Sequence, residues 1–132
     1  MAKQQQDLKL IRLELARSKE FPNGSATHGY EFVAPLDSEA HIDPALWRKH
    51  RDRCRVRRFW GEEAEAGHLL HRPGGPEHAQ WVFDYDGGVA EHDDETGYRF
   101  AAHAFRPGEY VSISDPASGM HTLRVVSVMP AT

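Results

Sequence analysis

The chain has 132 residues and a formal net charge of −4, and 39% of its residues are hydrophobic and 27% charged. A chain of this length buries enough surface to fold as one domain without a disulfide or a metal, and this composition excludes global disorder. The single cysteine excludes an internal disulfide, and no apolar run reaches the roughly 20 residues that span a bilayer. Residues 1–6 are polar and do not resemble a signal segment. We therefore expect a flexible N-terminus over 1–6, a single β-rich domain over 7–130 and a cytoplasmic location.

The first predicted element covers residues 8–16. Apolar residues alternate there with polar ones, with a phase slip at Ile11, and this pattern predicts a bulged strand. A helix is the alternative, because Leu8, Ile11 and Leu15 also fit spacings of three and four residues.

Two turn signals shape the next part of the chain. Residues 21–25 contain Asn-Gly, which tolerates the positive φ of a tight turn, so a second strand over 30–34 is expected to form a hairpin with the first. Asp43 and Pro44 then predict the start of one short helix near residues 44–51. Asp caps the free amides of a helix, and Pro suits its first position.

The segment 48–58 is strongly basic, with seven Lys or Arg residues against one acid. Its alternation predicts a strand with Arg55 and Arg57 on the exposed face, and these two arginines are candidate ligand-binding residues. The acids of 62–65 follow at once and are expected to lie across a tight turn, so that the charges pair within the protein or between subunits. Nucleic-acid binding through 48–58 is the alternative, but the overall negative charge argues against it.

The rest of the chain alternates in short runs separated by Pro and Gly. We expect a short strand over 68–71, a strand over 79–85, an acidic loop over 91–95 and three C-terminal strands. The fold class is therefore mainly β: a single antiparallel β-barrel or β-sandwich of about seven or eight short strands, with one short α-helix. The expected core contains Trp81, Phe83, Tyr98, Phe100, Val111, Ile113, Leu123 and Val125.

Histidines are the candidate metal ligands, because the chain has nine of them and imidazole is a common ligand of transition metals. His68, His71, His78 and His103 are the named candidates for a divalent-metal site of three imidazoles and one carboxylate. His68 and His71 are three residues apart, which places them on opposite faces of a regular strand. Scattered surface or hydrogen-bonded histidines are the alternative, and the sequence requires no cofactor.

Cys54 is the candidate nucleophile. The arginines around it would favour the thiolate, and His50 lies four residues earlier, so the two could form the pair that nucleophilic catalysis needs. A half-buried strand cysteine that alternates with Val56 is the favoured interpretation, because no third group that would orient the histidine is identifiable.

Two segments near the C-terminus, 105–111 (Phe-Arg-Pro-Gly-Glu-Tyr-Val) and 124–127 (Arg-Val-Val-Ser), resemble the flavin-contacting barrel segments of ferredoxin-reductase-type domains. In that family a Pro-Gly-Gln-aromatic strand precedes an Arg-x-Tyr-Ser motif, whose Arg, Tyr and Ser hold the flavin and its phosphate. Here Val126 stands in place of the Tyr, and a Glu replaces the Gln. The resemblance implies a flavin-binding barrel remnant in which Arg124 and Ser127 contact the ligand.

These patterns predict a small binding or interaction module that is not an enzyme and that associates with itself, as a homodimer. The alternative is a small ligand-binding or metal-binding barrel, with or without catalysis, that uses a histidine-lined pocket. A small-molecule ligand fits both hypotheses, whereas nucleic acid and membranes are not expected as partners.

Overall fold

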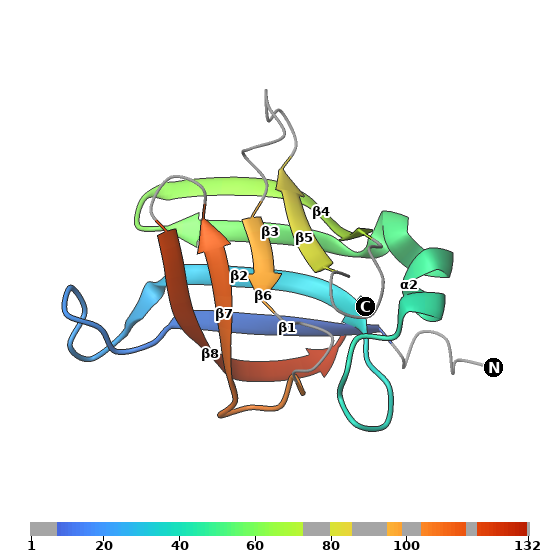
Figure 1. The fold of residues 1–132 in the computed structure, drawn as a ribbon, viewed down its shortest axis with the longest axis horizontal. Coiled ribbons are helices and arrows are strands. Elements are labelled where there is room, and N and C mark those ends of the chain that lie inside the picture. Colours follow the sequence, from blue (N-terminus) through green and yellow to red (C-terminus); the bar gives the residue numbers. More distant parts are fainter. Residues whose placement is uncertain (1–7, 73–79, 86–94, 99–103, 116–118, 132) are drawn as a thin grey trace.

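The structure is a computed structural model that describes residues 8–72, 80–85, 95–98, 104–115 and 119–131 (Figure 1). Its strands are β1 (Leu8–Leu15), β2 (Ser25–Pro35), β3 (Arg55–Trp60), β4 (Glu63–Arg72), β5 (Gln80–Tyr85), β6 (Glu95–Tyr98), β7 (Tyr110–Asp115) and β8 (Gly119–Pro130). Between β2 and β3 lie the helix α2 (Pro44–His50) and a 3₁₀ turn, η1 (Arg51–Arg53).

The eight described strands form one antiparallel sheet that closes on itself. Each strand pairs with the next along the chain, and β8 returns to pair with β1. In Figure 1, β1 to β4 run across the view, while β5 to β7 run steeply along it, as expected for a strongly twisted sheet. The predicted mainly β, antiparallel fold is confirmed. Of the two predicted alternatives, barrel and sandwich, the structure is a closed barrel.

Strand β1 carries the predicted bulge. Leu8, Ile11, Leu13 and Leu15 are buried, so the inward phase slips between Leu8 and Ile11. The register also shifts between Arg12 and Leu13 against β8, and between Glu14 and Leu15 against β2. The extra residues bend β1 so that it can pair with a neighbour on both sides.

Aromatic side chains fill much of the barrel interior. Phe32 lies at their centre, with its ring centroid 5.2 Å from that of Phe83 and 5.6 Å from that of Phe105. Six residues of the predicted core are buried: Trp81, Phe83, Val111, Ile113, Leu123 and Val125. The side chain of Tyr98 and the whole of Phe100 lie outside the described part of the chain.

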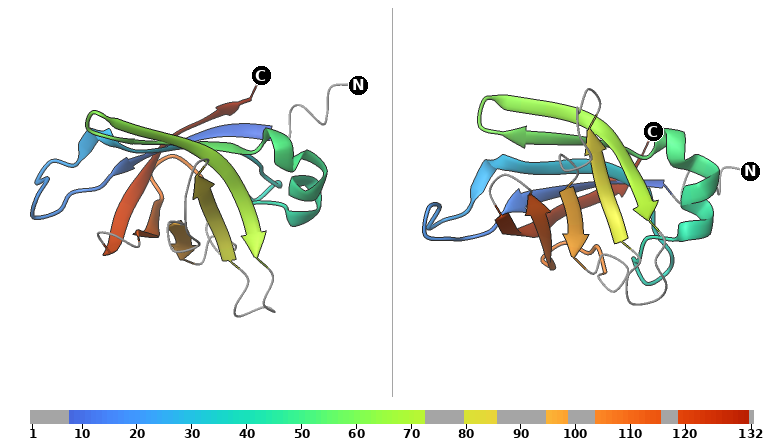
Figure 2. Two further views of the ribbon diagram at one scale, coloured as in Figure 1. Left: turned by 90° about the horizontal axis from the view of Figure 1, so that it is seen from above. Right: turned by 45° about the horizontal axis from the view of Figure 1, so that its top comes forward.

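Helix α2 begins as predicted and covers one end of the barrel (Figure 2). The Asp43 carboxylate caps it by accepting hydrogen bonds from the backbone N–H groups of Ala45, at 2.9 Å, and Leu46, at 3.2 Å. The buried Trp47 fastens the helix to the barrel, because its indole N–H donates to the Leu69 carbonyl at 2.8 Å. The β1–β2 loop lies at the opposite end (Figures 1 and 2).

Three predicted boundaries are wrong. Strand β2 begins at Ser25 and not at residue 30. Strand β4 begins at Glu63 and not near residue 68, and β6 begins at Glu95, where an acidic loop was predicted. On β4 the cause is a polar residue on the inward face: Glu65 is the register partner of the inward-facing Arg58 and interrupts the apolar alternation. Of the predicted strand over 98–102, residues 99–103 lie outside the described residues. No helix among the residues described is both long enough and apolar enough to cross a membrane.

Candidate functional site

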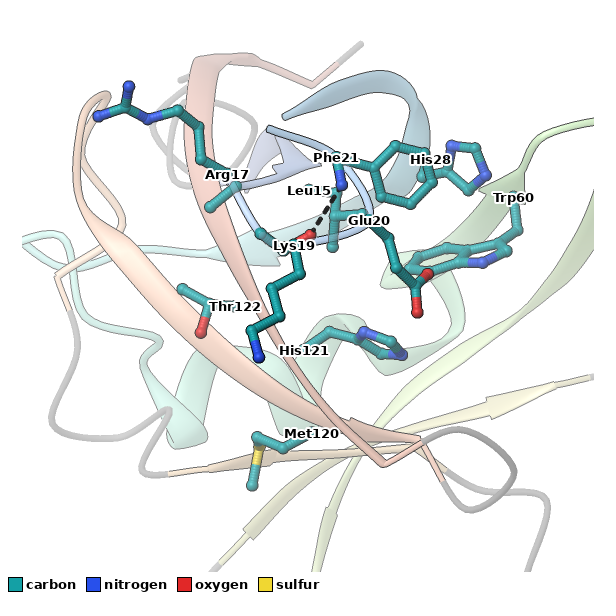
Figure 3. Close-up of a pocket in the computed structure, with 12 residues that line it drawn as sticks. Leu15, Arg17, Lys19, Glu20, Phe21, His28, Trp60, Met120, His121 and Thr122 are labelled. Carbon is teal, nitrogen blue, oxygen red and sulfur yellow. Dashed lines mark hydrogen bonds between the residues drawn. The ribbon is translucent and has the colours of Figure 1, made fainter. Parts of the chain in front are cut away.

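A cavity of about 630 Å³ opens at the end of the barrel opposite α2 (Figure 3). Its walls come from three places: the β1–β2 loop, the facing positions of β2 and β3, and the first residues of β8. This volume falls in the range of cavities that hold small molecules. The end of the barrel that α2 leaves open is thus the candidate site.

Four aromatic rings line one wall of this cavity, and we call Phe21, His28, Trp60 and His121 the ring row (Figure 3). Successive ring centroids lie 4.8 Å apart from Phe21 to His28, 5.0 Å from His28 to Trp60 and 5.1 Å from Trp60 to His121. Such tilted and edge-to-face contacts are favourable for aromatic pairs. The ring row therefore forms a continuous π surface along the cavity.

Strand register brings the ring row together. His28 is the register partner of Trp60, and it shares a face of β2 with the fully buried Tyr30 and Phe32. His121 shares a face of β8 with the buried Leu123 in the same way. The inward-facing residues near the ends of these three strands therefore lie around the same opening.

Neighbouring groups hold His28 and Trp60 in place. His28 Nδ1 lies 2.8 Å from the Ser25 hydroxyl oxygen and 3.2 Å from that of Thr27. The Arg58 guanidinium lies over the Trp60 ring, 4.5 Å from its centroid, and its Nη1 is 3.8 Å from a Glu65 carboxylate oxygen. Arg58 is only 9% exposed, so this cation is built into the wall of the barrel.

The β1–β2 loop covers the cavity with charged side chains. Figure 3 shows the Glu20 carboxylate reaching toward Trp60 and the Lys19 side chain extending toward Thr122 and Met120, whereas Arg17 points away from the cavity. The loop keeps its shape through a turn in which the Gly24 N–H donates to the Phe21 carbonyl at 2.9 Å. The Phe21 N–H in turn donates to the Ser18 hydroxyl at 3.2 Å (Figure 3).

A second cavity, of about 770 Å³, lies on the other side of the same loop. Arg124, one of the predicted ligand-binding residues, lines it together with Tyr110, which is 57% exposed. Ser127 is half-buried, and its backbone pairs with Arg12 of β1. Neither Arg124 nor Ser127 lines the cavity of the ring row.

The predicted ligand-binding arginines of β3 lie on the outer surface and make polar contacts there. Arg57 donates to a Glu31 carboxylate oxygen at 2.8 Å, and Arg55 Nη1 lies 3.1 Å from His68 Nε2. Glu31 also accepts from Arg12 at 3.2 Å. Burial opposes the charge on Glu31, but the hydrogen bonds from Arg57 and Arg12 outweigh it and lower its pKa.

The structure describes two of the four predicted metal ligands, His68 and His71. His68 pairs with the exposed Arg55 and Asp84, whereas His71 pairs with the buried Trp81, so the two histidines face opposite sides of β4 as the spacing predicts. His78 and His103 lie outside the residues described. Within the described part of the chain, no group of three or more His, Cys, Asp or Glu side chains could hold a metal ion.

His71 belongs to an aromatic cluster under α2. Its ring centroid is 4.4 Å from that of Trp81 and 5.9 Å from that of Trp47. Burial and then the nearby charge of Arg48 lower the His71 pKa. The indole N–H of Trp81 and Nε2 of His50 are buried without a hydrogen-bond partner among the described residues. Two hydrogen-bonding groups at this end of the barrel are therefore unsatisfied.

Cys54 does not have the environment of a nucleophile. It is fully buried, and this burial raises its pKa to about 12, an effect that the charge of Arg53 only partly offsets. The expected thiolate stabilisation by neighbouring arginines is therefore overturned, because loss of hydration outweighs their charge. The favoured interpretation, a half-buried strand cysteine, also needs correction, because Cys54 is fully buried and lies just before β3.

The ring row was not predicted from the sequence. A signal was present, because His28, Trp60 and His121 each continue the inward phase of a strand as far as its polar end. Extending the period of two beyond the apolar residues would have placed all three on the inner face. Comparisons with protein families, curated proteins and solved structures find no match to this chain.

Proposed function

We propose that this chain is a non-catalytic binding module whose small-molecule ligand occupies the cavity beside the ring row. The observation that carries this proposal is the ring row itself: four rings spaced at 4.8–5.1 Å along a cavity of about 630 Å³. Aromatic side chains at the mouth of a barrel offer a broad contact surface and lose little conformational entropy when a ligand binds.

The packing of the barrel supports a ligand at its end and not along its axis. An eight-stranded barrel is just wide enough either to be filled by side chains or to hold one small ligand. Here the middle of the interior is occupied by Tyr30, Phe32 and Phe83, which are at most 1% exposed. The free volume lies beyond them, where the inward residues on β2, β3 and β8 are His28, Trp60 and His121.

The histidine-lined site of this proposal differs from the one that the sequence indicated. It uses His28 and His121 in place of the predicted metal-site histidines. Their ring centroids lie 5.0 Å (His28) and 5.1 Å (His121) from that of Trp60. Self-association remains a prediction as well. Among the described strands each one pairs with two neighbours, and the edge that β4 leaves unpaired beside β5, at Glu63–Ala66, is short.

A neutral planar dye tests the proposal. We expect anilinonaphthalene to bind and gain fluorescence, and Trp60→Leu to weaken its binding about tenfold, since one aromatic stacking contact is worth about 1–3 kcal/mol. His121→Ala is expected to act in the same direction. Tyr110→Ala removes an exposed aromatic ring outside the cavity and is the matched control, which should bind like the unchanged protein.

Circular dichroism and the midpoint of urea unfolding show whether each variant is folded. His121→Ala keeps the test usable if Trp60→Leu unfolds the barrel. Dye binding that survives both substitutions, or that falls equally in Tyr110→Ala, would contradict the proposal.

A further inference from the structure

The β1–β2 loop beside the cavity differs in sign from the charge of the whole chain. The β1–β2 loop contributes two cations, Arg17 and Lys19, against one carboxylate, Glu20, whereas the chain carries a formal charge of −4. All three residues are exposed on the loop. An anion that approaches along the β1–β2 loop therefore meets a net positive segment, whereas Glu63, the register partner of Trp60, makes the β3–β4 side of the opening acidic.

Only one of the loop cations is placed to contact a ligand on the ring row. In Figure 3 the Lys19 side chain extends over the cavity toward Met120 and Thr122, while the Arg17 guanidinium points away. A lysine ammonium is a flexible point charge with three donors, which suits an acidic group of varied shape. Met120, which is 57% exposed, adds a soft apolar contact at the same rim.

We propose that the ligand of this site is a planar aromatic molecule with one acidic group, a carboxylate, sulfonate or phosphate. This inference rests on the binding function proposed above and adds the class of ligand. The aromatic plane packs on Trp60 and His121, and the acidic group lies next to the Lys19 ammonium. Glu20, whose carboxylate lies near Trp60 in Figure 3, selects against ligands that carry a second acid there.

Anilinonaphthalene and its sulfonate derivative test this class, because they share one ring system and differ by a single acidic group. We expect the sulfonate to bind about tenfold more tightly at low salt and to lose most of this advantage at about 300 mM salt. Lys19→Gln should weaken sulfonate binding about fivefold and leave the neutral dye unchanged.

Two neighbouring substitutions make the assignment to Lys19 specific. Arg17→Gln removes the same charge from the same loop and is the matched control, with an expected change of less than about twofold. Glu20→Gln should tighten sulfonate binding about threefold while its circular dichroism and urea midpoint stay those of the unchanged protein, because a loosened fold would also bind more of this dye. Lys49→Gln, on the exposed face of α2 at the other end of the barrel, should have no effect.

The outcomes separate this inference from the binding function. Equal affinity for the two dyes, or an equal loss for both in Lys19→Gln, overturns the acidic-ligand class, while loss of the neutral dye in Trp60→Leu still supports the binding site. If neither dye responds to the ring-row substitutions, both proposals fall.

Discussion

His71 shows how burial sets the charge of a single side chain. Its ring lies against Trp81 and Trp47, and burial followed by the charge of Arg48 lowers its pKa from 6.5. As the pH falls below 6.5, the unfolded chain binds a proton that the folded protein resists. The stability due to His71 is therefore present above pH 6.5 and is lost as the pH falls through the lowered pKa.

We expect an NMR titration of the imidazole to give a midpoint below 6.5 for His71 in the folded protein. Arg48→Gln should raise this midpoint, because it removes one of the two causes. His71→Phe should keep the ring packing and reduce the fall in unfolding free energy between neutral and mildly acidic pH. A His71 midpoint at or above 6.5 would contradict this picture.

Strands β4 and β5 approach each other closely at Gly67. A Cβ atom built on Gly67 would overlap the Asp84 carbonyl oxygen and come within 2.6 Å of the Tyr85 Cα atom. We expect Gly67→Ala to lower the unfolding free energy by about 3 kcal/mol, because backbone atoms cannot move aside as a flexible side chain would. Denaturant unfolding measures this loss.

The control for Gly67→Ala is Ala66→Ser, at the adjacent exposed position of β4. It should change the unfolding free energy by less than about 0.5 kcal/mol. A Gly67→Ala protein as stable as this control would show that the two strands can separate at little cost.

Strands β1 and β4 and helix α2 show what the sequence can and cannot predict. Strand β1 and helix α2 follow from local signals: the bulged alternation around Ile11, and the Asp43 cap before Pro44. The full length of β4 does not, because Glu65, the register partner of the buried Arg58, is a half-exposed polar residue in the inward phase and breaks the apolar pattern. The ring row was not predicted for the same physical reason. A strand that carries polar residues on its inner face has the same sequence pattern as a loop.

For the molecule as a whole, closure of the sheet is the feature that local sequence cannot give. It depends on pairing between β1 and β8, more than 100 residues apart, with a shift of register between Arg12 and Leu13. Closure pairs each described strand on both sides. It also creates two ends, one covered by α2 and one carrying the ring row, so that the site is a consequence of the topology.

The distribution of charge over the whole molecule decides whether its basic strand attracts nucleic acid. On the outer surface Glu31 accepts from Arg57 at 2.8 Å and from Arg12 at 3.2 Å, and both guanidiniums lie over the Phe59 ring, 4.4 Å (Arg12) and 5.2 Å (Arg57) from its centroid. This arrangement occupies two of the cations and the aromatic ring that a nucleic acid would use for phosphate contacts and stacking.

We therefore predict that mixed-sequence single-stranded DNA binds with a dissociation constant weaker than about 10 µM at physiological salt, and that the affinity falls steeply as salt rises. Glu31→Gln releases the charge of Arg57 and should tighten this binding a few-fold, whereas Glu109→Gln removes the same charge from an exposed site after Gly108 and should not. Fluorescence anisotropy measures each affinity. Submicromolar binding that disappears in a folded Arg55→Glu, Arg57→Glu double variant would make nucleic acid the principal partner, because pairing with Glu31 would then have failed to neutralise the strand.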